Sequence, residues 1–435
     1  MARVSREPVE VVVESLSHEG RGVARRDGKT VFVFGALPGE RVQARITRRR
    51  GSFDEAEATA VETPAPARIE PRCEHFGVCG GCGLQHVDED FQLAHKQAVL
   101  LELLRHHAGV QPESVAAPIR GPQWGYRRKA RLGLKHVPRK GGVIIGFRER
   151  GSPFITDCQR CDTLDPRVGT ILPALRALID GLSIPDRIPQ FEVAVSDERV
   201  ALVLRHLAPL SEADRDTLAV AASELGVEFY LQAGGPDTVV PLAGEARPLV
   251  YRVDDLALEF APTDFTQVNP AINAQMVARA LDYLAPAPTD RVADLFCGLG
   301  NFTLPIARRA GTVIGVEGDE ALTTRAAANA AANGIANVDF AVTDLARPEA
   351  VAALMLGSPN KMLLDPPRAG AAAVIEGVAL AGIERLVYVS CNPVTFVRDA
   401  AVLRRTHGFV LAETGILDMF PQTAHVESIS LFVRR

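Results

Sequence analysis

The sequence predicts an α/β protein with a doubly wound, Rossmann-like sheet in its C-terminal part. Three observations predict this fold: short alternating strands near the N-terminus, strands mixed with helix in the middle, and regular strand–helix alternation from about residue 275. Such alternation is typical of a mainly parallel sheet with helices on both faces. We therefore expect three domains, at residues 1–65, 66–262 and 263–435.

The N-terminal segment reads as a small β-barrel. Apolar and polar residues alternate through residues 8–62, with breaks at Gly20, Gly28 and Pro38-Gly39. Alternation over four to eight residues between glycine or proline breaks indicates short strands around a small core. The pattern predicts a five-stranded, OB-like barrel, followed by the Pro/Ala-rich linker TPAPARIEP.

Most of the cysteines are grouped. Five of the seven fall into a close triplet and a distant pair: Cys73, Cys79, Cys82, Cys158 and Cys161. Disulfides are rare in the cytosol, so metal binding or catalysis is the better expectation. Four thiolates can bind zinc or an iron–sulfur cluster, and the neighbouring His75 and His86 keep a mixed zinc site open.

The middle region combines helices and strands. Apolar residues at helical spacing predict one helix over residues 88–109 and another around 166–182. Short strand-like runs follow in RLGLKH, VIIGFRER, FEVAVS, VALVLRH and VEFYLQA. This composition predicts an α+β domain.

The charge distribution is uneven. The formal net charge of −5 argues mildly against a nucleic-acid partner. However, residues 121–150 are rich in lysine and arginine, and Arg45 with 48–50 forms a second basic patch. Phosphate contacts need local rather than global positive charge. Three aromatic residues are candidates for stacking on splayed bases: Trp124, Tyr126 and Phe265.

No segment looks like a membrane or secretory signal. The chain has no run of roughly 20 apolar residues, and its start, MARVSREPVE, lacks an apolar core. We expect a cytoplasmic protein without a membrane partner. Nothing in the sequence indicates an obligate protein partner, so we expect a monomer.

The predicted C-terminal sheet carries a ligand-binding pattern. In VADLFCGLGNFTLP, a strand containing Asp294 runs into Gly298 and Gly300 and then a helix, which lets the backbone approach a ligand. The next two strands end in Glu317, suited to ribose hydroxyls, and in Asp344, suited to the adenine region. The dinucleotide fingerprint G-x-G-x-x-G is incomplete, so the pattern favours S-adenosylmethionine over NAD.

Two later strand ends indicate the chemistry. LLDPPR places Asp365 beyond a strand, and LVYVSCNP ends a further strand at Cys391. Carbon 5 of uracil is a poor nucleophile, but a thiolate that adds to carbon 6 activates it, and cysteine suits that role. Amine methyltransferases carry an Asn/Asp-Pro-Pro-aromatic motif at this place, and here Arg368 replaces the aromatic residue. If DPPR is a variant of that motif, methylation of an exocyclic amine is an alternative.

A general base is expected near the C-terminus. Glu427 lies beside His425 at the junction of a loop and a closing strand, and either could remove the proton from carbon 5. Cytosine-5 methyltransferases commonly place their nucleophile after the proline pair, where this chain has Arg368, which favours uracil. A further alternative is an iron–sulfur RNA-binding protein without methyl transfer.

Together, these motifs resemble the bacterial RNA uracil-5-methyltransferase family over nearly the whole chain. The resemblance implies an S-adenosyl-L-methionine-dependent class I methyltransferase domain, an N-terminal TRAM barrel that binds RNA, and an α+β central domain with a 4Fe-4S cluster. CEHFGVCGGCGLQH and QRCDTLDP imply the cluster ligands Cys73, Cys79, Cys82 and Cys161, with Cys158 an extra thiol.

The same resemblance implies the site residues. FTQVNP, DLFCGLGNFTLP and DPPRAG carry the implied cofactor-site positions Gln267, Phe296, Asn301 and Asp365, and the strand-end acids Glu317 and Asp344 complete them. FTQVNP also implies that Phe265 lies near the substrate base. SCNP implies Cys391 as the nucleophile, and HVES implies Glu427 as the proton acceptor. The tRNA enzymes of the family lack both the TRAM segment and the cysteine cluster, so the resemblance implies 23S ribosomal RNA as substrate, with tRNA as the alternative.

Overall fold

The computed structural model describes residues 7–354, 358–377 and 380–435, which divide into two compact units. Unit 1 comprises Met1–Val99, Arg148–Phe154 and Phe420–His425. Unit 2 comprises Leu100–Phe147, Ile155–Met419 and Val426–Arg435. Two short segments, 148–154 and 420–425, therefore belong to unit 1 although the chain on either side of each belongs to unit 2.

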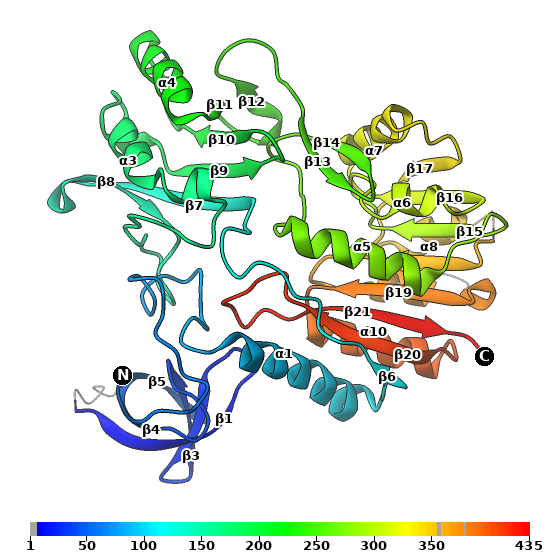
Figure 1. Ribbon diagram of the computed structural model, residues 1–435, viewed down its shortest axis with the longest axis horizontal. Coiled ribbons are helices and arrows are strands. Elements are labelled where there is room, and N and C mark those ends of the chain that lie inside the picture. The colour runs from blue at the N-terminus through cyan, green and yellow to red at the C-terminus, as the bar shows by residue number, and fades with distance from the viewer. Residues whose placement is uncertain (1–6, 355–357, 378–379) are drawn as a thin grey trace. The chain divides into compact units, whose positions relative to one another are not determined.

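Unit 1 is built around a closed barrel of strand order β1-β2-β3-β5-β4, drawn in blue in Figure 1. Its strands are β1 (Val9–Leu16), β2 (Gly22–Arg26), β3 (Lys29–Phe34), β4 (Arg41–Arg49) and β5 (Phe53–Thr63). Alternate residues point inward, and Val13, Val33 and Val42 are buried in the core. The predicted five-stranded barrel is confirmed.

The helix predicted at residues 88–109 is also present. It consists of α1 (Glu89–Leu103) and a π-helical turn over Leu104–Ala108, and it ends at Gly109, which adopts a left-handed conformation (φ 62°). Glycine is the usual residue for this way of ending a helix.

Segment 420–425 is attached to α1 and to the cysteine-rich segment of unit 1. The Gln92 carboxamide accepts a hydrogen bond from the backbone N–H of Gln422 (3.1 Å) and donates one to its side-chain oxygen (3.2 Å). The backbone N–H groups of Gly83 and Leu84 both donate to the carbonyl oxygen of Gln422 (2.9 Å each). Gln422 itself has a left-handed backbone (φ 67°), which is uncommon for a residue with a side chain.

The central part of unit 2 contains a six-stranded sheet of order β12-β11-β10-β9-β7-β8. The strands are β7 (Lys129–Val137), β8 (Gly142–Gly146), β9 (Gln190–Val195), β10 (Val200–Arg205), β11 (Glu228–Gln232) and β12 (Val239–Pro241). Helices α3 (Leu172–Asp180) and α4 (Glu212–Leu225) accompany this sheet, and Leu175, Phe191 and Leu218 belong to its core.

The prediction of a single helix around residues 166–182 is wrong. The chain forms α2 (Pro166–Gly169) and then α3, with a break between them. Gly169 packs so closely on the carbonyl oxygen of Cys161 that an added Cβ would lie 2.2 Å from it. Pro173 lies in the first turn of α3, where its missing N–H costs no helical hydrogen bond.

The C-terminal part of unit 2 contains an eight-stranded sheet of order β17-β16-β15-β18-β19-β21-β20-β6. The strands are β6 (Ser114–Val115), β15 (Arg291–Leu295), β16 (Thr312–Glu317), β17 (Val338–Val342), β18 (Lys361–Leu364), β19 (Arg385–Ser390), β20 (Val410–Leu417) and β21 (Glu427–Val433). The strands from β15 to β19 are parallel, and β21 is antiparallel to both of its neighbours. The predicted doubly wound sheet is confirmed.

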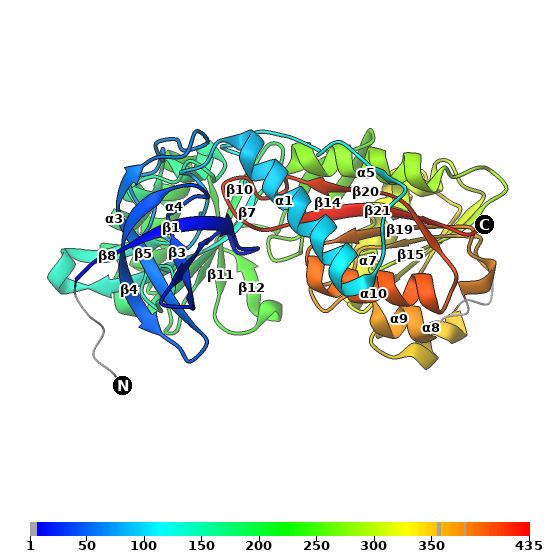
Figure 2. The same ribbon diagram turned by 90° about the horizontal axis from the view of Figure 1, so that it is seen from below.

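Helices cover both faces of this sheet. In Figure 2, α5 lies on one face, and α8, α9 and α10 lie on the other. The helices are α5 (Pro270–Leu284), α6 (Thr303–Ala307), α7 (Glu320–Ala332), α8 (Pro348–Leu354), α9 (Ala372–Gly377) and α10 (Pro393–Arg405). The helix expected over 371–381 is shorter than predicted among the described residues, since α9 ends at Gly377 and residues 378–379 lie outside them.

The strand order reverses between β15 and β18, which makes this position the topological switch point of the sheet. Ligands of doubly wound sheets bind beyond the carboxyl ends of the strands at such a point. A two-stranded sheet of β13 (Leu249–Val253) and β14 (Leu256–Phe260) precedes α5. Among the described residues, no helix combines the length and apolar character that crossing a membrane requires.

Candidate active site

The glycine-rich loop after β15 folds against the end of β16. Phe296 has a left-handed backbone (φ 67°), and its N–H and that of Cys297 both donate to the carbonyl oxygen of Val316 (2.9 and 3.1 Å). The Glu317 carboxylate accepts hydrogen bonds from the backbone N–H of Gly298 (3.1 Å) and of Gly318 (2.7 Å). The loop and this carboxylate therefore form one hydrogen-bonded unit at the edge of the sheet.

Asn301 ends this loop beside α5. Its carboxamide forms two reciprocal hydrogen bonds with that of Asn273, each 2.9 Å long. Gln267 and Phe265 lie in the segment that leads into α5, where Gln267 is partly buried and Phe265 is 69% exposed. Asp344 follows β17, is exposed, and accepts a hydrogen bond from the N–H of Ala346 (3.0 Å).

Asp294 is a buried carboxyl beneath this loop. It lies on β15 with no exposed surface. Burial, reinforced by the charge of Glu317, raises its pKa to about 7. The sequence pointed to Asp294 only as an acid before the glycine loop and not as a site residue.

Cys391 lies where β19 ends and α10 begins. Asn392 caps α10, since its side chain accepts a hydrogen bond from the N–H of Val394 (3.1 Å), and Pro393 occupies the first turn. Cys391 is partly buried. A cysteine in this position is fixed by a strand on one side and by a capped helix on the other.

The strand register brings Glu427 next to Cys391. Ser390 of β19 pairs with Ser428 of the antiparallel strand β21. In such a pair, the residue after Ser390 and the residue before Ser428 are neighbours. Glu427 is only 7% exposed, so a carboxylate lies beside the thiol in a largely buried position.

The electrostatics of this group are dominated by negative charge. Burial, together with the charges of Glu427 and Asp365, raises the pKa of the Cys391 thiol to about 11, although Arg368 acts to lower it. Burial, together with the charges of Glu427 and Asp294, also holds the pKa of Asp365 well above its ordinary value. Asp365 directly follows β18, the strand between β15 and β19, so the group spans the switch point.

The loop that carries Arg368 is bound to the first turns of α10. The carbonyl oxygen of Arg368 accepts hydrogen bonds from the Asn392 carboxamide (3.0 Å) and the Thr395 hydroxyl (3.1 Å). The Asp399 carboxylate, which is fully buried, accepts one from the N–H of Ala371 (2.7 Å). Sequence analysis missed these contacts, although the run NPVT after Cys391 is the sequence signal of a capped helix start.

The three clustered cysteines lie in a looped segment of unit 1. The N–H of Gly81 donates to the sulfur of Cys79 (3.4 Å), and the N–H of Cys73 donates to the Gln85 side chain (3.0 Å). Cys82 directly precedes Gly83 in the chain and is partly buried. In this segment, the backbone N–H of Gly81 is therefore directed at the sulfur atom of Cys79.

The second cysteine pair lies in unit 2. Cys158 is buried in the core of the six-stranded sheet, whereas Cys161 is partly exposed with its sulfur 3.3 Å from the Thr163 hydroxyl. Across the described residues, no three or more histidine, cysteine, aspartate or glutamate side chains are gathered as a metal site. The assignment of cluster ligands stays a prediction.

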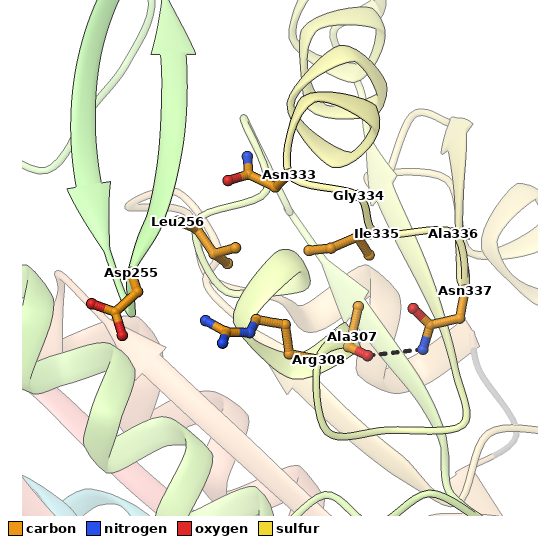
Figure 3. Close-up of a pocket in the computed structure, with 9 residues that line it drawn as sticks. All are labelled: Asp255, Leu256, Ala307, Arg308, Asn333, Gly334, Ile335, Ala336 and Asn337. Carbon is orange, nitrogen blue, oxygen red and sulfur yellow. Dashed lines mark hydrogen bonds between the residues drawn. The ribbon is translucent and has the colours of Figure 1, made fainter.

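A pocket of about 420 Å³ lies elsewhere in unit 2 (Figure 3). It is lined by the turn between β13 and β14, the end of α6 and the loop after α7, namely Asp255, Leu256, Ala307, Arg308, Asn333, Gly334, Ile335, Ala336 and Asn337. None of the site residues that the sequence predicts lines it. This pocket is therefore separate from the group around Cys391.

Comparison with known proteins assigns the family. The family model for tRNA (uracil-5-)-methyltransferases matches residues 245–435, and that for the TRAM domain matches residues 3–59. A protein of Alkalilimnicola ehrlichii named 23S rRNA (uracil(1939)-C(5))-methyltransferase RlmD is 54% identical over 99% of this chain and 98% of its own length. The chain belongs to the RNA uracil-5-methyltransferase family. A relative of the same name from Aromatoleum aromaticum is 52% identical over 97% of this chain and 99% of its own length.

A solved structure agrees on the fold. The tRNA (uracil-54, C5)-methyltransferase of Pyrococcus abyssi, in complex with S-adenosyl-L-homocysteine, has a TM-score of 0.76 at 22% identity and covers 98% of this chain and 99% of its own. The barrel of unit 1 is a TRAM domain, and the C-terminal sheet has the fold of a methyltransferase of this family. Family membership makes the protein an enzyme that methylates carbon 5 of uracil in RNA. It decides against methylation of an exocyclic amine and against an iron–sulfur RNA-binding protein without methyl transfer.

Proposed function

We propose that this enzyme methylates carbon 5 of one uridine in 23S ribosomal RNA, at the position for which its relatives are named, uracil 1939. The observation that carries this proposal is the 54% identity to an RlmD protein over nearly the full length of both chains. The same chemistry on tRNA is the second candidate, since the structure from Pyrococcus abyssi is that of a tRNA enzyme. A ribosomal RNA substrate also fits the expected cytoplasmic location.

Cys391 is the proposed nucleophile. Its sulfur adds to carbon 6 of the uracil ring, which gives carbon 5 the electron density needed to attack an electrophilic methyl group. S-adenosylmethionine, when bound, supplies that methyl group on a positively charged sulfonium. The raised pKa of Cys391 means that the thiol must lose its proton as the substrates bind, and Arg368 is the nearby cation that favours the thiolate.

Glu427 is the proposed base of the final step. Once carbon 5 carries the methyl group, its hydrogen must leave as a proton so that the bond between carbon 6 and Cys391 can break. The β19–β21 register supports this role, because it puts Glu427 beside Cys391. His425, the other candidate base, belongs to segment 420–425 of unit 1.

The methyl donor is proposed to bind at the carboxyl ends of β15, β16, β17 and β18. Glu317 would accept hydrogen bonds from the ribose hydroxyls, and Asp344 would lie near the adenine. Gln267, Phe296, Asn301 and Asp365 complete the proposed site. The left-handed backbone at Phe296 supports it, since such a conformation at a loop is common where a ligand binds.

We also propose that Cys73, Cys79, Cys82 and Cys161 hold a 4Fe-4S cluster. All four donors are sulfur, the ligand type of such clusters, and the N–H of Gly81 directed at Cys79 is the kind of hydrogen bond that tunes them. Cys158 is buried in a hydrophobic core and serves as the matched control. Iron and sulfide analysis of anaerobically purified protein should show iron lost in Cys161→Ala and retained in Cys158→Ala.

RNA binding is proposed for the TRAM barrel and the 121–150 stretch. On β4 and just after it, Arg48, Arg49 and Arg50 are exposed, whereas Arg45 pairs with Glu57 (2.8 Å); on the β7–β8 hairpin Lys135, Arg139 and Lys140 are exposed. Other basic residues of the stretch are structural, because Arg128 pairs with Asp197 (2.5 Å) and the partly buried Lys129 pairs with Glu192 (3.4 Å). Exposed rather than paired cations are suited to phosphate contacts.

Two measurements test the proposal. Mapping of 5-methyluridine in RNA from cells with and without the gene should show loss at one 23S position and none in tRNA; the reverse pattern would select the tRNA candidate. RNA carrying 5-fluorouridine at the target should form a covalent adduct with the enzyme and S-adenosylmethionine, and Cys391→Ser should form none. Methyl transfer that survives in Cys391→Ser would exclude the thiolate mechanism.

A further inference from the structure

The carboxamide of Asn301 is bound by two side chains from outside its own loop. Asn273 of α5, which is 3% exposed, exchanges two hydrogen bonds with it (2.9 Å each). The Tyr251 hydroxyl of β13 donates a third to the Asn301 oxygen (3.2 Å). Burial raises the pKa of Tyr251, so this phenol keeps its proton at any physiological pH.

These hydrogen bonds leave the Asn301 carboxamide with one N–H donor that they do not use. A carboxamide has two N–H donors and an oxygen with two lone pairs. The oxygen of Asn301 accepts from both Asn273 and Tyr251, and its nitrogen donates once, to Asn273. One N–H remains, and the three bonds fix its direction.

The loop that ends in Asn301 is anchored at two further points. The Asn329 carboxamide, 1% exposed on α7, donates to the carbonyl oxygen of Leu299 (3.3 Å). Gly298 donates to Glu317 (3.1 Å). Because the loop backbone is already held in this way, the additional bonds to the Asn301 side chain act mainly on the orientation of that side chain.

We infer that Tyr251 and Asn273 are positioning residues for the methyl donor: they orient the Asn301 carboxamide so that its remaining N–H donates to S-adenosylmethionine. This inference rests on the proposed cofactor role of Asn301. It gives the β13–β14 hairpin and α5, which both precede the first strand of the methyltransferase sheet, a part in cofactor affinity. Neither residue needs to touch the cofactor.

The test measures the affinity of the full-length protein for S-adenosylmethionine and S-adenosylhomocysteine by calorimetry. Tyr251→Phe removes one hydrogen bond with little change in shape, so we expect the Kd to rise about 2–10-fold. Asn273→Ala removes two, and we expect a rise of about 10-fold or more. In steady-state kinetics, KM for S-adenosylmethionine should rise while KM for RNA stays unchanged.

Tyr230→Phe is the matched control. Tyr230 is buried in the hydrophobic cluster against which Tyr251 packs, but its hydroxyl donates to the carbonyl oxygen of Arg247 (3.3 Å) and not to Asn301. This variant also loses one phenol hydrogen bond of unit 2, and its cofactor affinity should equal that of the wild type. A loss of affinity in Tyr230→Phe equal to that in Tyr251→Phe would indicate a general structural effect and overturn the inference.

A double-mutant comparison separates a route through Asn301 from any other. In an Asn301→Ala background, Tyr251→Phe and Asn273→Ala should cause no further loss of affinity. Equal losses in both backgrounds, or unchanged affinity in both single variants, overturn the inference. If wild type fails to bind S-adenosylmethionine, or Asn301→Ala binds it as wild type does, the proposed function of the site fails instead.

Discussion

The hydroxyl of Thr303 donates a 2.5 Å hydrogen bond to the carboxyl of Asp294, and neither residue has any surface exposed to solvent. The pair joins the end of the strand β15 to the start of α6. Because burial raises the pKa of Asp294 to about 7, this carboxyl carries a proton in the folded protein over much of the acidic range.

Asp294→Asn should change how stability depends on pH. The ordinary pKa of 3.8 lies below the folded value of about 7, so the folded state binds the proton more tightly. Between these values, the free energy of unfolding of the wild type falls as pH rises, by at most about 1.4 kcal/mol per unit. Asparagine cannot ionise, so the variant should gain about 1–3 kcal/mol relative to wild type between pH 5 and pH 8. Urea unfolding at both pH values measures this; an equal difference at both would contradict it.

Cys391 should react slowly with iodoacetamide at neutral pH. With its pKa raised to about 11, the thiolate fraction should rise about tenfold per pH unit between pH 7 and pH 10, and the alkylation rate with it. Peptide mass spectrometry reports modification at Cys391 separately from the other cysteines. Cys297, which is 4% exposed, should stay unmodified as the internal control. A rate that levels off near pH 8 would contradict the raised pKa.

Substitutions on either side of Cys391 should shift its reactivity in opposite directions. Glu427 raises the pKa of the thiol, so Glu427→Gln should speed alkylation at pH 8 about 2–10-fold. Arg368 lowers that pKa, so Arg368→Gln should slow alkylation by a similar factor. The pair controls for general loosening of the site, which would speed the reaction in both variants.

The barrel should depend strongly on Arg68. Glu40 has no exposed surface, and the Arg68 guanidinium forms two hydrogen bonds with its carboxylate (2.5 and 2.7 Å). Burial alone would raise the pKa of Glu40, but Arg68 and the N–H groups of Ala65 and Leu37 outweigh it and lower the pKa. Arg68→Met leaves a buried charge without its cation, which costs about 3–5 kcal/mol.

This loss can be measured by thermal unfolding at pH 7, and the double variant Arg68→Met with Glu40→Gln should recover part of it. Because the folded pKa of Glu40 is lowered, its contribution to stability is present above the ordinary pKa of 4.5 and is lost as pH falls below it. The penalty of Arg68→Met should therefore shrink at acid pH. A penalty independent of pH would argue against the ion pair.

Asp399 should be needed for turnover although it is buried behind the site. Its carboxylate accepts hydrogen bonds from the Tyr388 hydroxyl and from the N–H of Ala371, both 2.7 Å long. Both donors bond to the same carboxylate oxygen, and the other oxygen accepts hydrogen bonds from the Arg398 guanidinium (2.7 and 2.8 Å), which also donates to the carbonyl oxygen of Ala369 (2.9 Å). In Asp399→Asn, the amide nitrogen must face one of these two sets of donors, and either placement loosens the loop that carries Arg368. We expect kcat to fall about tenfold with little change in KM for S-adenosylmethionine. The exposed Asp186→Asn serves as control, and an unchanged kcat in Asp399→Asn would refute the link.

The elements of this protein could be predicted largely because their signals are local. Alternation with glycine breaks predicts the TRAM barrel, and strand–helix alternation predicts the doubly wound sheet. The helix α4 was missed, although Ser211 and Asp214 form a capping box, a signal that was present in the sequence. The break between α2 and α3 has a local signal in Pro173, which a continuous helix could not accommodate without losing a hydrogen bond, whereas the packing of Gly169 against Cys161 is tertiary and no local pattern contains it.

The site residues lie on separate strands, so their spatial relationships could not be predicted from spacing. Cys391 and Glu427 become neighbours only through the β19–β21 register. The bonds of Asn301 to Asn273 and Tyr251 likewise join segments far apart in the chain. Motifs in the sequence indicate which residues carry chemistry, whereas the support around them depends on tertiary packing.

The attachment of segment 420–425 to unit 1 limits how this enzyme can be shortened. Gln422 depends on Gln92, Gly83 and Leu84 for its hydrogen bonds, and all three lie before residue 100. A fragment consisting only of the methyltransferase sheet and its helices would lack these partners, and its segment between β20 and β21 would be an unsupported stretch ending two residues before Glu427. Minimal versions of the enzyme, or chimaeras that exchange its RNA-binding module, therefore need to retain the cysteine-rich segment and α1.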